Sequence, residues 1–294
     1  MYVITGATGH TGKLIAQQLL EAGKSVKVIS RKPENVADLI AKGAEAVIGD
    51  LADAAFLTEA FKGATAVYAM IPPKWDVTDW RAFQLELTNS LVKAVKESGV
   101  KNVVMLSSQG AHMPEGAGPV SGLYYLEQGL KEIPGINVLA LRPGFFMENL
   151  YGNMGLMKQA GIWGYSMQPD LKMPFVHTRD IAAIGAQRLL ALDFNGFSHQ
   201  FIAGAADLSM SEVADTLNKG LGTQIPYIAF SKEDAFNGMV QAGIPATIAH
   251  GYGELFNALN SSEYQVGYAR TPENTTPTTL EWFVENEFKH AWNA

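Results

Sequence analysis

The chain has no cysteine among its 294 residues, and its charged residues are few, at 17%. Without cysteine there can be no disulfide bond, no thiolate nucleophile and no cysteine-ligated metal. Lysine and arginine number 22 against 29 aspartate and glutamate residues, which gives a net charge of -7. Because nucleic-acid binding needs clustered basic side chains, this deficit argues against a nucleic acid as the main partner.

Long apolar runs are also missing, since none reaches the roughly 18 residues that would indicate a membrane-spanning helix. The first residues, Met1-Tyr2-Val3, lack the basic region and apolar stretch of a signal peptide. The six histidines are scattered, without the H-x-x-x-H spacing of a metal site. We therefore expect a cytoplasmic protein that binds neither a membrane nor a metal, while a monomer and a homodimer both stay open.

What the chain does have is an alternation of short apolar strands with helical segments. The expected strands are residues 2–5, 26–30, 46–48, 66–71, 102–107 and 137–141. Helical apolar spacing falls between them, at 13–22, 35–41, 54–61 and 81–98. This rhythm predicts an α/β fold with a doubly wound parallel sheet of the Rossmann type.

The alternation of strands and helices becomes irregular after Arg142, which predicts that the chain divides into two regions. Residues 1–150 are expected to form a dinucleotide-binding domain, with its sheet completed by parts of 174–204. A smaller, mainly helical region, residues 151–173 and 205–294, is expected to fold over the carboxyl ends of the strands. Ligands of doubly wound sheets bind at that edge, so this region would form the substrate wall.

The strongest local signal is a G-x-x-G-x-x-G run, Gly6 to Gly12, which follows the first strand and opens a helix. Gly6 permits the tight turn, Gly9 lets the backbone approach a pyrophosphate, and Gly12 lets the helix pack close to the sheet. The unpaired N–H groups and the positive end of the helix dipole then face the phosphates. A nicotinamide dinucleotide is the expected cofactor.

The choice between NADP(H) and NAD(H) depends on the end of the second strand. An enzyme specific for NAD usually has an acidic residue there, whereas this chain reads Ser30-Arg31-Lys32. Arginine forms a charged fork with a 2′-phosphate and lysine adds a point charge, so NADP(H) is favoured over NAD(H). The alternative is a solvated basic pair. Asp50, after the third strand, either lies near the adenine or caps a helix.

Several motifs resemble those of the NmrA-like group of atypical short-chain dehydrogenases. That group includes quinone reductases, triphenylmethane reductase-like enzymes and NADP-sensing regulators. The motifs are VITGATGHTG at 3–12, GDL at 49–51, SS at 107–108, LRPGFFMEN at 141–149, HTRDIA at 177–182 and TPTTLEWF at 276–283. The resemblance therefore spans nearly the whole chain.

The resemblance implies a set of cofactor contacts, which we state as expectations. The pyrophosphate would be wrapped by Gly6, Thr8, Gly9, His10, Thr11 and Gly12, and the 2′-phosphate would be met by Arg31 and Lys32, next to Ser30. The adenine would be flanked by Asp50 and Leu51, and the ribose by Met70, Ile71 and Pro72. The nicotinamide would lie near Ser107, Ser108 and Gln109, and its border with the substrate near Pro143, Gly144, Phe145 and Phe146.

The proton-transfer residues of the group are missing. Classical members use Tyr-x-x-x-Lys, but Tyr124 and Tyr125 are followed at that spacing by glutamine and glycine. Some NmrA-like enzymes place a lysine one turn before the glutamate that matches Glu127, and here that residue is Leu123. The remaining candidate proton donors are His112, Tyr124 and Tyr125, and each has the alternative of being an ordinary loop or packing residue.

Aromatic residues gather after the Arg-Pro-Gly turn at 142–144. Phe146, Trp163 and Tyr165 are expected to wall an apolar substrate pocket together with Trp75, although core packing explains any one of them equally well. The favoured function is transfer of hydride from NADPH to a quinone or a similar planar, conjugated small molecule, whose oxygen can take its proton from water. The alternative is a non-catalytic NADP(H) sensor that acts through a protein partner.

Overall fold

The computed structural model describes residues 1–294, and its centre is a seven-stranded parallel sheet in the order β10-β6-β5-β4-β1-β2-β3. The strands are β1 Tyr2–Ile4, β2 Val26–Ser30, β3 Glu45–Ile48, β4 Ala66–Ala69, β5 Asn102–Leu106, β6 Asn137–Pro143 and β10 Phe197–Ile202. The strand order runs outward in both directions from the β1–β4 pair, which is where doubly wound sheets bind their ligands. The predicted doubly wound Rossmann fold is confirmed.

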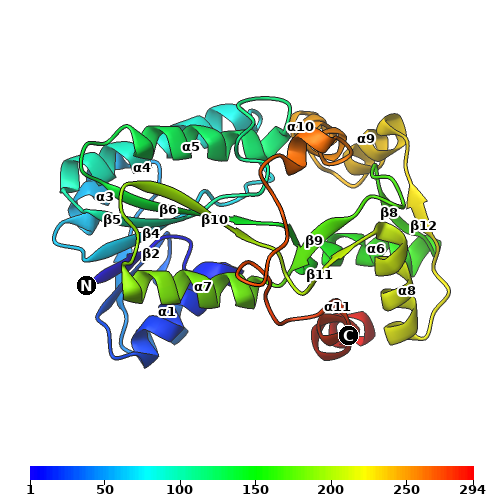
Figure 1. Ribbon diagram of the computed structural model, residues 1–294, viewed down its shortest axis with the longest axis horizontal. Helices are drawn as coiled ribbons and strands as arrows, with labels where there is room; N and C mark the ends of the chain where they lie inside the picture. The colour runs from blue at the N-terminus through cyan, green and yellow to red at the C-terminus, as the bar shows by residue number, and fades with distance from the viewer.

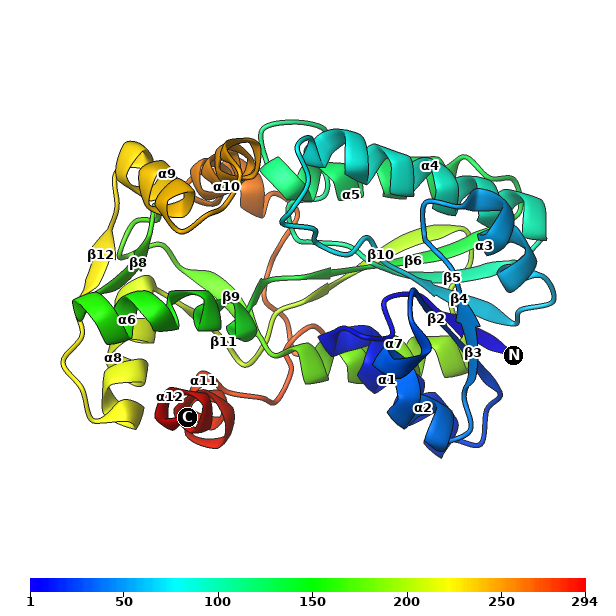
Figure 2. The ribbon, with the colours of Figure 1, turned by 180° about the vertical axis from the view of Figure 1, so that it is seen from behind.

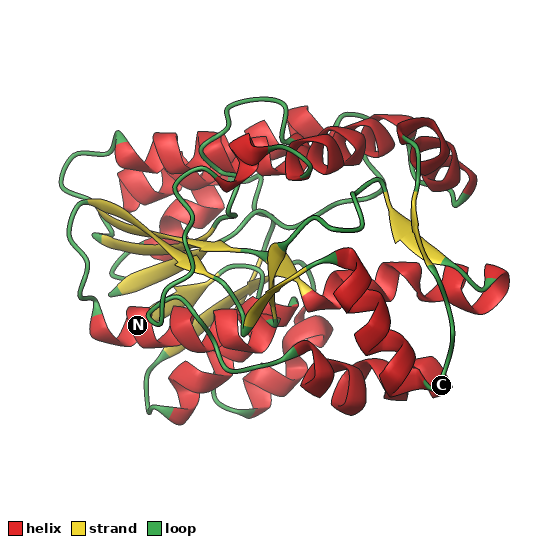
Figure 3. Cartoon of the chain, turned by 45° about the vertical axis from the view of Figure 1, so that its right-hand side comes forward, coloured by secondary structure: helices red, strands yellow, loops and turns green.

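Helices cover both faces of this sheet (Figures 1, 2 and 3). One layer holds α1 His10–Glu21, α2 Ala37–Ala41 and α7 Thr178–Ala191, and the other holds α3 Ala54–Phe61, α4 Trp80–Ser98 and α5 Ser121–Lys131. Alternate residues of a strand serve the two layers, so that Ile4 packs with α1 and α7 whereas Val3 packs with α3, α4 and α5. Because both faces are covered, all four residues of β4 are buried.

The observed elements agree with the sequence pattern where that pattern is clear. The strand at 26–30 and the helix at 54–61 have the predicted bounds. Helix α1 begins at His10, three residues before the expected start, because Gly9 already serves as its N-cap. The helix expected at 35–41 is shorter, since Pro33–Val36 first forms a 3₁₀ turn.

A smaller region lies beyond the carboxyl ends of the strands (Figure 1). It contains a three-stranded sheet of β7 Phe145–Phe146, β9 Met173–Val176 and β11 Ala206–Leu208, and a two-stranded sheet of β8 Trp163–Tyr165 and β12 Tyr227–Ala229. Its helices are α6 Met154–Ala160, α8 Met210–Leu221, α9 Lys232–Gln241, α10 Ala246–Leu259, α11 Leu280–Phe283 and α12 Lys289–Asn293. Within 174–204, β10 thus joins the main sheet and β9 does not. None of the helices in the chain combines the length and apolar character needed to span a membrane.

Helix α10 is fixed to the Rossmann domain at the start of α4. The indole Nε1 of Trp80 donates a hydrogen bond to the carbonyl oxygen of Thr247 at 2.8 Å. The Arg81 guanidinium forms an ion pair with the Glu254 carboxylate at 2.5 Å. These contacts hold α10 against the carboxyl edge of the sheet, so side chains of the smaller region can reach the ends of the strands.

Candidate cofactor and substrate site

The turn between β1 and α1 brings three glycines together. Gly6 adopts a φ of +63°, in the left-handed region that favours glycine, and a side chain there would meet Met70. At Gly12 a Cβ atom would lie 2.4 Å from the carbonyl oxygen of Gly6, so only glycine lets α1 pack this closely. At Gly9 a Cβ atom would have one ordinary contact, at 3.4 Å. The fold itself therefore requires Gly6 and Gly12, whereas the space beside Gly9 is open to a ligand.

The N-terminus of α1 offers unpaired donors to an anion. Gly9 is the N-cap and has no side chain to cap the helix, and the first turn holds no acidic residue. The first N–H groups therefore have no partner from the protein and carry the positive end of the helix dipole. Thr8 and His10 are exposed beside them, whereas Thr11 is buried and its hydroxyl lies 3.0 Å from the Tyr68 hydroxyl. The expected pyrophosphate contact of Thr11 is thus limited to its backbone N–H.

The end of β2 presents two exposed cations that form no ion pair. Ser30 is buried, and its hydroxyl donates to the carbonyl oxygen of Lys32 at 2.8 Å, which fixes the turn after the strand. The side chains of Arg31 and Lys32 stay exposed, and neither has an acidic partner. Because β2 lies beside β1, both cations are available to a phosphate near the glycine turn.

The loop after β3 leaves Asp50 free of a capping role. Its carboxylate accepts from the backbone N–H of Ala52 at 2.9 Å, which closes a local turn. Helix α3 is capped instead by Asp53, whose carboxylate accepts from two N–H groups of the first helical turn. The alternative of Asp50 as a helix cap is therefore wrong, and Asp50 stays exposed next to the partly buried Leu51.

The residues after β4 lie against the glycine turn. The backbone N–H of Met70 donates to the Thr5 hydroxyl at 3.0 Å, and the Met70 side chain covers Gly6. Ile71 is buried, and Pro72 borders a small cavity of about 40 Å³ under the β4–α4 loop. The end of β4 thus forms one side of the surface that begins at the glycine turn.

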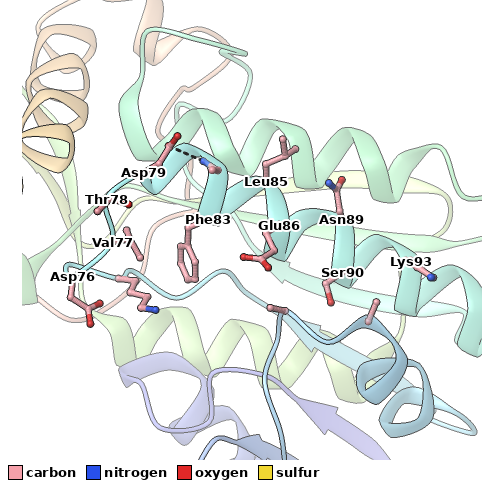
Figure 4. A pocket seen from close by; sticks show the side chains of 14 residues that line it. Asp76, Val77, Thr78, Asp79, Phe83, Leu85, Glu86, Asn89, Ser90 and Lys93 are labelled. Carbon is pink, nitrogen blue, oxygen red and sulfur yellow. Dashed lines mark hydrogen bonds between the residues drawn. The ribbon is translucent and has the colours of Figure 1, made fainter.

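An open groove of about 1000 Å³ lies between α4 and the loops after β3 and β4 (Figure 4). Phe83, Glu86 and Ser90 point from α4 toward the β4–α4 loop (Figure 4). The rim carries charges of both signs, including Lys74 and Asp76, and no residue from the ends of β5 or β6 lines it. The groove therefore adjoins the loops after β3 and β4 and does not reach the ends of β5 and β6.

At the carboxyl end of β5, a buried ion pair holds Ser107 in place. Glu127 of α5 is 0% exposed, and Arg142 of β6 is 9% exposed. The Arg142 guanidinium donates to both carboxylate oxygens of Glu127, at 3.0 and 2.5 Å. The Ser107 hydroxyl donates to the same carboxylate at 2.5 Å. The hydroxyl hydrogen of Ser107 is therefore used in the hydrogen bond to Glu127. Toward a ligand, the Ser107 hydroxyl can only accept a hydrogen bond.

Two buried nitrogen atoms on the segment after β5 have no partner in the protein, namely Gln109 Nε2 and His112 Nδ1. A buried polar atom without a hydrogen bond is unfavourable by about 1–3 kcal/mol, so two such atoms fit a site that receives a polar ligand. His112 Nε2 lies 2.9 Å from the carbonyl oxygen of Glu263. Since a carbonyl only accepts, His112 Nε2 carries a hydrogen and donates it to Glu263, which leaves Nδ1 as the ring nitrogen without a partner.

Tyr124 and Tyr125 occupy different sides of α5. Residues two apart on a helix are separated by about 200°, so Tyr125 points away from Glu127 and the sheet, and it is 49% exposed. The expectation that Tyr125 faces the site is therefore not met. Tyr124 is partly buried nearer the sheet, and its ring meets that of Tyr125 edge-on. Leu123, where some family members have lysine, packs among apolar residues, so α5 supplies no ammonium group at this position.

Tyr264, which no sequence motif marked, is brought by the fold to the end of β5. Tyr264 belongs to the 3₁₀ turn η4 Ser262–Gln265 and is 6% exposed. Its hydroxyl lies 3.3 Å from the Ser108 hydroxyl, and its ring covers Gly110, where a Cβ atom would be 2.2 Å away. Burial raises the pKa of Tyr264, so the phenol is protonated at neutral pH. The one local signal in the sequence was the glycine after Gln109, which marks a close approach by another segment.

Phe145 and Phe146 point to opposite sides of β7, as neighbours in a strand do. The Phe145 ring lies 5.8 Å from Tyr165 and 5.3 Å from Phe175, in the smaller region. Phe146 instead packs against the core of the Rossmann domain. Phe145 therefore faces the smaller region, whereas Phe146 packs against the Rossmann core and not in the expected substrate wall. Pro143 and Gly144 connect β6 to this short strand.

Five aromatic side chains form a continuous row from the β4–α4 loop to β7, and we call it the aromatic row: Trp75, Tyr252, Phe256, Tyr165 and Phe145. Trp75 stacks on Tyr252 at 5.1 Å with 16° between the ring planes. Phe256 then links Tyr252 at 6.2 Å to Tyr165 at 5.5 Å. Tyr252 and Phe256 are one helical turn apart on α10 and were not identified from the sequence.

Trp163 lies outside the aromatic row. It is 1% exposed and packs in the core of the smaller region, with its ring 6.2 Å from Tyr165 and 4.8 Å from Tyr227. It therefore supports the row from within the core and does not reach a ligand, contrary to the expectation. Trp75, at 47% exposed, is the most accessible member of the predicted wall.

Known proteins resemble this chain over almost its whole length. Residues 2–293 match the NmrA-like family. An NAD(P)H azoreductase of Xenophilus azovorans is 29% identical over 295 residues, which cover 99% of this chain and 98% of that protein. An uncharacterized oxidoreductase, YesF, of Bacillus subtilis strain 168 is 30% identical over 268 residues, 90% of this chain and 86% of that protein.

The fold has a close counterpart among solved structures. The crystal structure of the NADPH-dependent quinone oxidoreductase QOR2 of Escherichia coli, complexed with NADPH, superimposes with a TM-score of 0.78. The superposition covers 98% of this chain and 100% of that one, at 22% sequence identity. With the match over residues 2–293, these likenesses confirm the resemblance seen in the motifs: the chain belongs to the NmrA-like family.

Proposed function

We propose that the protein is an NADPH-dependent oxidoreductase that transfers hydride to a quinone or a similar planar, conjugated electrophile. Use of NAD(P)H as a reductant is common to the azoreductase and the quinone oxidoreductase that the chain resembles. The observation that carries the proposal is the uncapped N-terminus of α1 on the same edge of the sheet as the aromatic row. A phosphate-binding turn and an aromatic wall on one edge suit a dinucleotide and a planar acceptor.

The residues of the chain fit a dinucleotide that runs along the carboxyl edge. Its pyrophosphate would meet the N–H groups of α1 beside Gly9, and its 2′-phosphate would meet Arg31 and Lys32. Gln109, with its unpartnered Nε2, would face the nicotinamide end. The bound cofactor supplies hydride, and the protein's part is to hold an acceptor against it, since proximity and orientation remove a large part of the barrier.

The aromatic row is the proposed wall for the acceptor. Phe145 begins the row next to the end of β6, and Trp75 closes it from the β4–α4 loop. Aromatic rings stack on flat conjugated molecules, so the row would select a planar acceptor. In this proposal residues 1–150 bind the cofactor and add Trp75 and Phe145 to the wall, while 151–173 with 205–294 form the rest of the substrate site, in a protein located in the cytoplasm.

Replacing Arg31 by alanine tests the cofactor choice. A charge-assisted hydrogen bond to the 2′-phosphate contributes about 1.5–3 kcal/mol, so we expect NADPH to bind about 10- to 150-fold more weakly. NADH lacks that phosphate, and its affinity should not change. Titrations followed by tryptophan fluorescence give both dissociation constants, and Lys42→Ala, another exposed cation, is the matched control. Equal losses for the two nucleotides would refute the role of Arg31.

Replacing Trp75 by alanine tests the place of the acceptor. Trp75 is half-exposed and stacks on Tyr252, so its loss removes one face of the proposed wall without opening the core. We expect KM for a planar quinone to rise about 2- to 12-fold, the worth of one aromatic contact, while KM for NADPH stays the same. Initial rates at varied quinone concentration measure this. Trp282→Ala, on α11, is the control, and an equal effect of both variants would refute the assignment.

A further inference from the structure

The reduced acceptor needs a proton, and the usual donors are not in place. Helix α5 offers Leu123 where some family members have lysine, and Tyr125 points away from the sheet. His112 Nε2 already donates to the carbonyl oxygen of Glu263, and the Ser107 hydroxyl already donates to Glu127. The hydroxyl pair of Ser108 and Tyr264 at the end of β5 offers another source of this proton.

We propose that Tyr264, acting through the hydroxyl of Ser108, is the proton donor for the reduced acceptor. This inference rests on the proposed function. The two hydroxyl oxygens are 3.3 Å apart, and Ser108 is partly exposed at the carboxyl end of β5, where the acceptor would be reduced. A hydroxyl can accept one hydrogen bond while it donates another, so Ser108 can pass a proton from Tyr264 to a ligand.

The surroundings of Tyr264 hold its hydroxyl in this position. Its ring fills the space above Gly110, which any side chain at that residue would occupy. The neighbouring residue Glu263 accepts, through its carbonyl oxygen, a hydrogen bond from His112 Nε2 at 2.9 Å. His112 is therefore a positioning residue, because it ties η4 to the segment after β5. The buried nitrogen atom of Gln109 on that same segment marks it as a place for a polar ligand.

The proton transfer balances with the reduction. When a conjugated acceptor receives hydride at one end, the nicotinamide is oxidised and an electron pair is left on the oxygen or nitrogen at the other end. That atom forms a bond to the Ser108 proton, and Ser108 in turn takes the phenolic proton of Tyr264. The phenolate that remains is reprotonated from solvent, so each cycle consumes one hydride and one proton.

Burial of Tyr264 decides which acceptors gain from this donor. Burial raises the pKa of its hydroxyl, so the phenol keeps its proton until a more basic anion forms beside Ser108. Alkoxides, enolates and the nitrogen anions of reduced azo groups are such bases. The site should therefore favour acceptors whose oxygen or nitrogen must be protonated after hydride transfer. Acceptors that need no proton should gain nothing from this donor.

The test compares two kinds of acceptor in the Tyr264→Phe variant, which lacks only the hydroxyl. With a conjugated enone, kcat should fall about 10²- to 10⁴-fold while KM for NADPH is unchanged. A cationic triarylmethane dye is neutralised by hydride alone, so the variant should reduce it at the rate of the unchanged protein. Tyr2→Phe is the control, because Tyr2 is buried to the same extent, at 7% exposed, at the amino end of β1. Equal losses with both acceptors overturn the proposal.

A binding measurement separates this inference from the proposed function. The anion of p-nitrophenol resembles a reduced acceptor, and its absorption shows when it is bound. We expect it to bind the complex with NADP⁺ more weakly after Tyr264→Phe, because the Ser108 hydroxyl that donates to the anion then no longer accepts a hydrogen bond from Tyr264. If this difference is found but no acceptor is turned over, the proposed function fails and the donor site stands. Equal binding to the variant and the unchanged protein, or no binding to either, overturns the donor site.

Discussion

Replacing Glu127 by alanine is expected to destabilise the protein by about 3–5 kcal/mol, a large share of the stability of an ordinary domain. Glu127 is fully buried, and its carboxylate is the only acidic partner of the Arg142 guanidinium. The variant leaves a buried positive charge without a partner and leaves the Ser107 hydroxyl without its acceptor. Denaturant unfolding followed by circular dichroism measures the change in the free energy of unfolding.

Two further variants separate the charge from the packing. Glu127→Leu combined with Arg142→Met removes both charges and keeps apolar volume, so it should recover most of the stability that the single change loses. The exposed pair Lys93–Glu97 on α4 is the matched control, and Glu97→Ala should change stability by less than about 1 kcal/mol. If Glu127→Ala cost no more than this surface change, the account of the buried pair would be wrong.

The second large effect is expected at Gly12. In Gly12→Ala the new Cβ atom would lie 2.4 Å from the carbonyl oxygen of Gly6, and neither backbone segment can move aside cheaply. Helix α1 must therefore shift, with a loss of stability of about 1–3 kcal/mol. The shift also carries away the N–H groups that would hold the pyrophosphate, so NADPH affinity should fall by at least about 100-fold. Calorimetric titration and thermal unfolding measure the two effects.

Gly9→Ala is the matched comparison within the same turn. Its Cβ atom has one ordinary contact at 3.4 Å, and its φ of -94° suits alanine, so the folded structure should accept it with little loss of stability. The methyl group would stand where the pyrophosphate approaches the backbone, and NADPH affinity should fall about 10- to 100-fold. Unchanged NADPH binding in Gly9→Ala would contradict the assignment of this turn to the pyrophosphate.

The fold and the glycine turn were predictable because their signals are local. Each strand and its following helix bury an apolar face within about 30 residues, and the spacing from Gly6 to Gly12 carries the geometry of the turn. Such patterns depend on neighbours in the sequence. The sequence for this reason indicated the Rossmann fold and its phosphate-binding edge without any knowledge of tertiary contacts.

The substrate side was predicted less well because it depends on contacts between distant segments. Tyr264 reaches Ser108 across 156 residues, and the aromatic row joins Trp75 to two side chains of α10. The sequence did not show which face of α5 is buried, so the direction of Tyr125 could not be predicted. The buried Glu127 shows which face this is. Trp163 has the composition of a substrate wall, but only the packing of β8 against β12 shows that it is covered.

The measurement that tests the central claim most directly is the loss of reduced-nicotinamide absorbance when the purified protein meets NADPH with a panel of quinones, azo dyes and conjugated enones. We predict saturable turnover of at least one planar acceptor, with a higher kcat/KM for NADPH than for NADH. Tight binding of NADPH without turnover of any acceptor would contradict the oxidoreductase function. That result would favour a sensor of NADP(H) that acts through a protein partner.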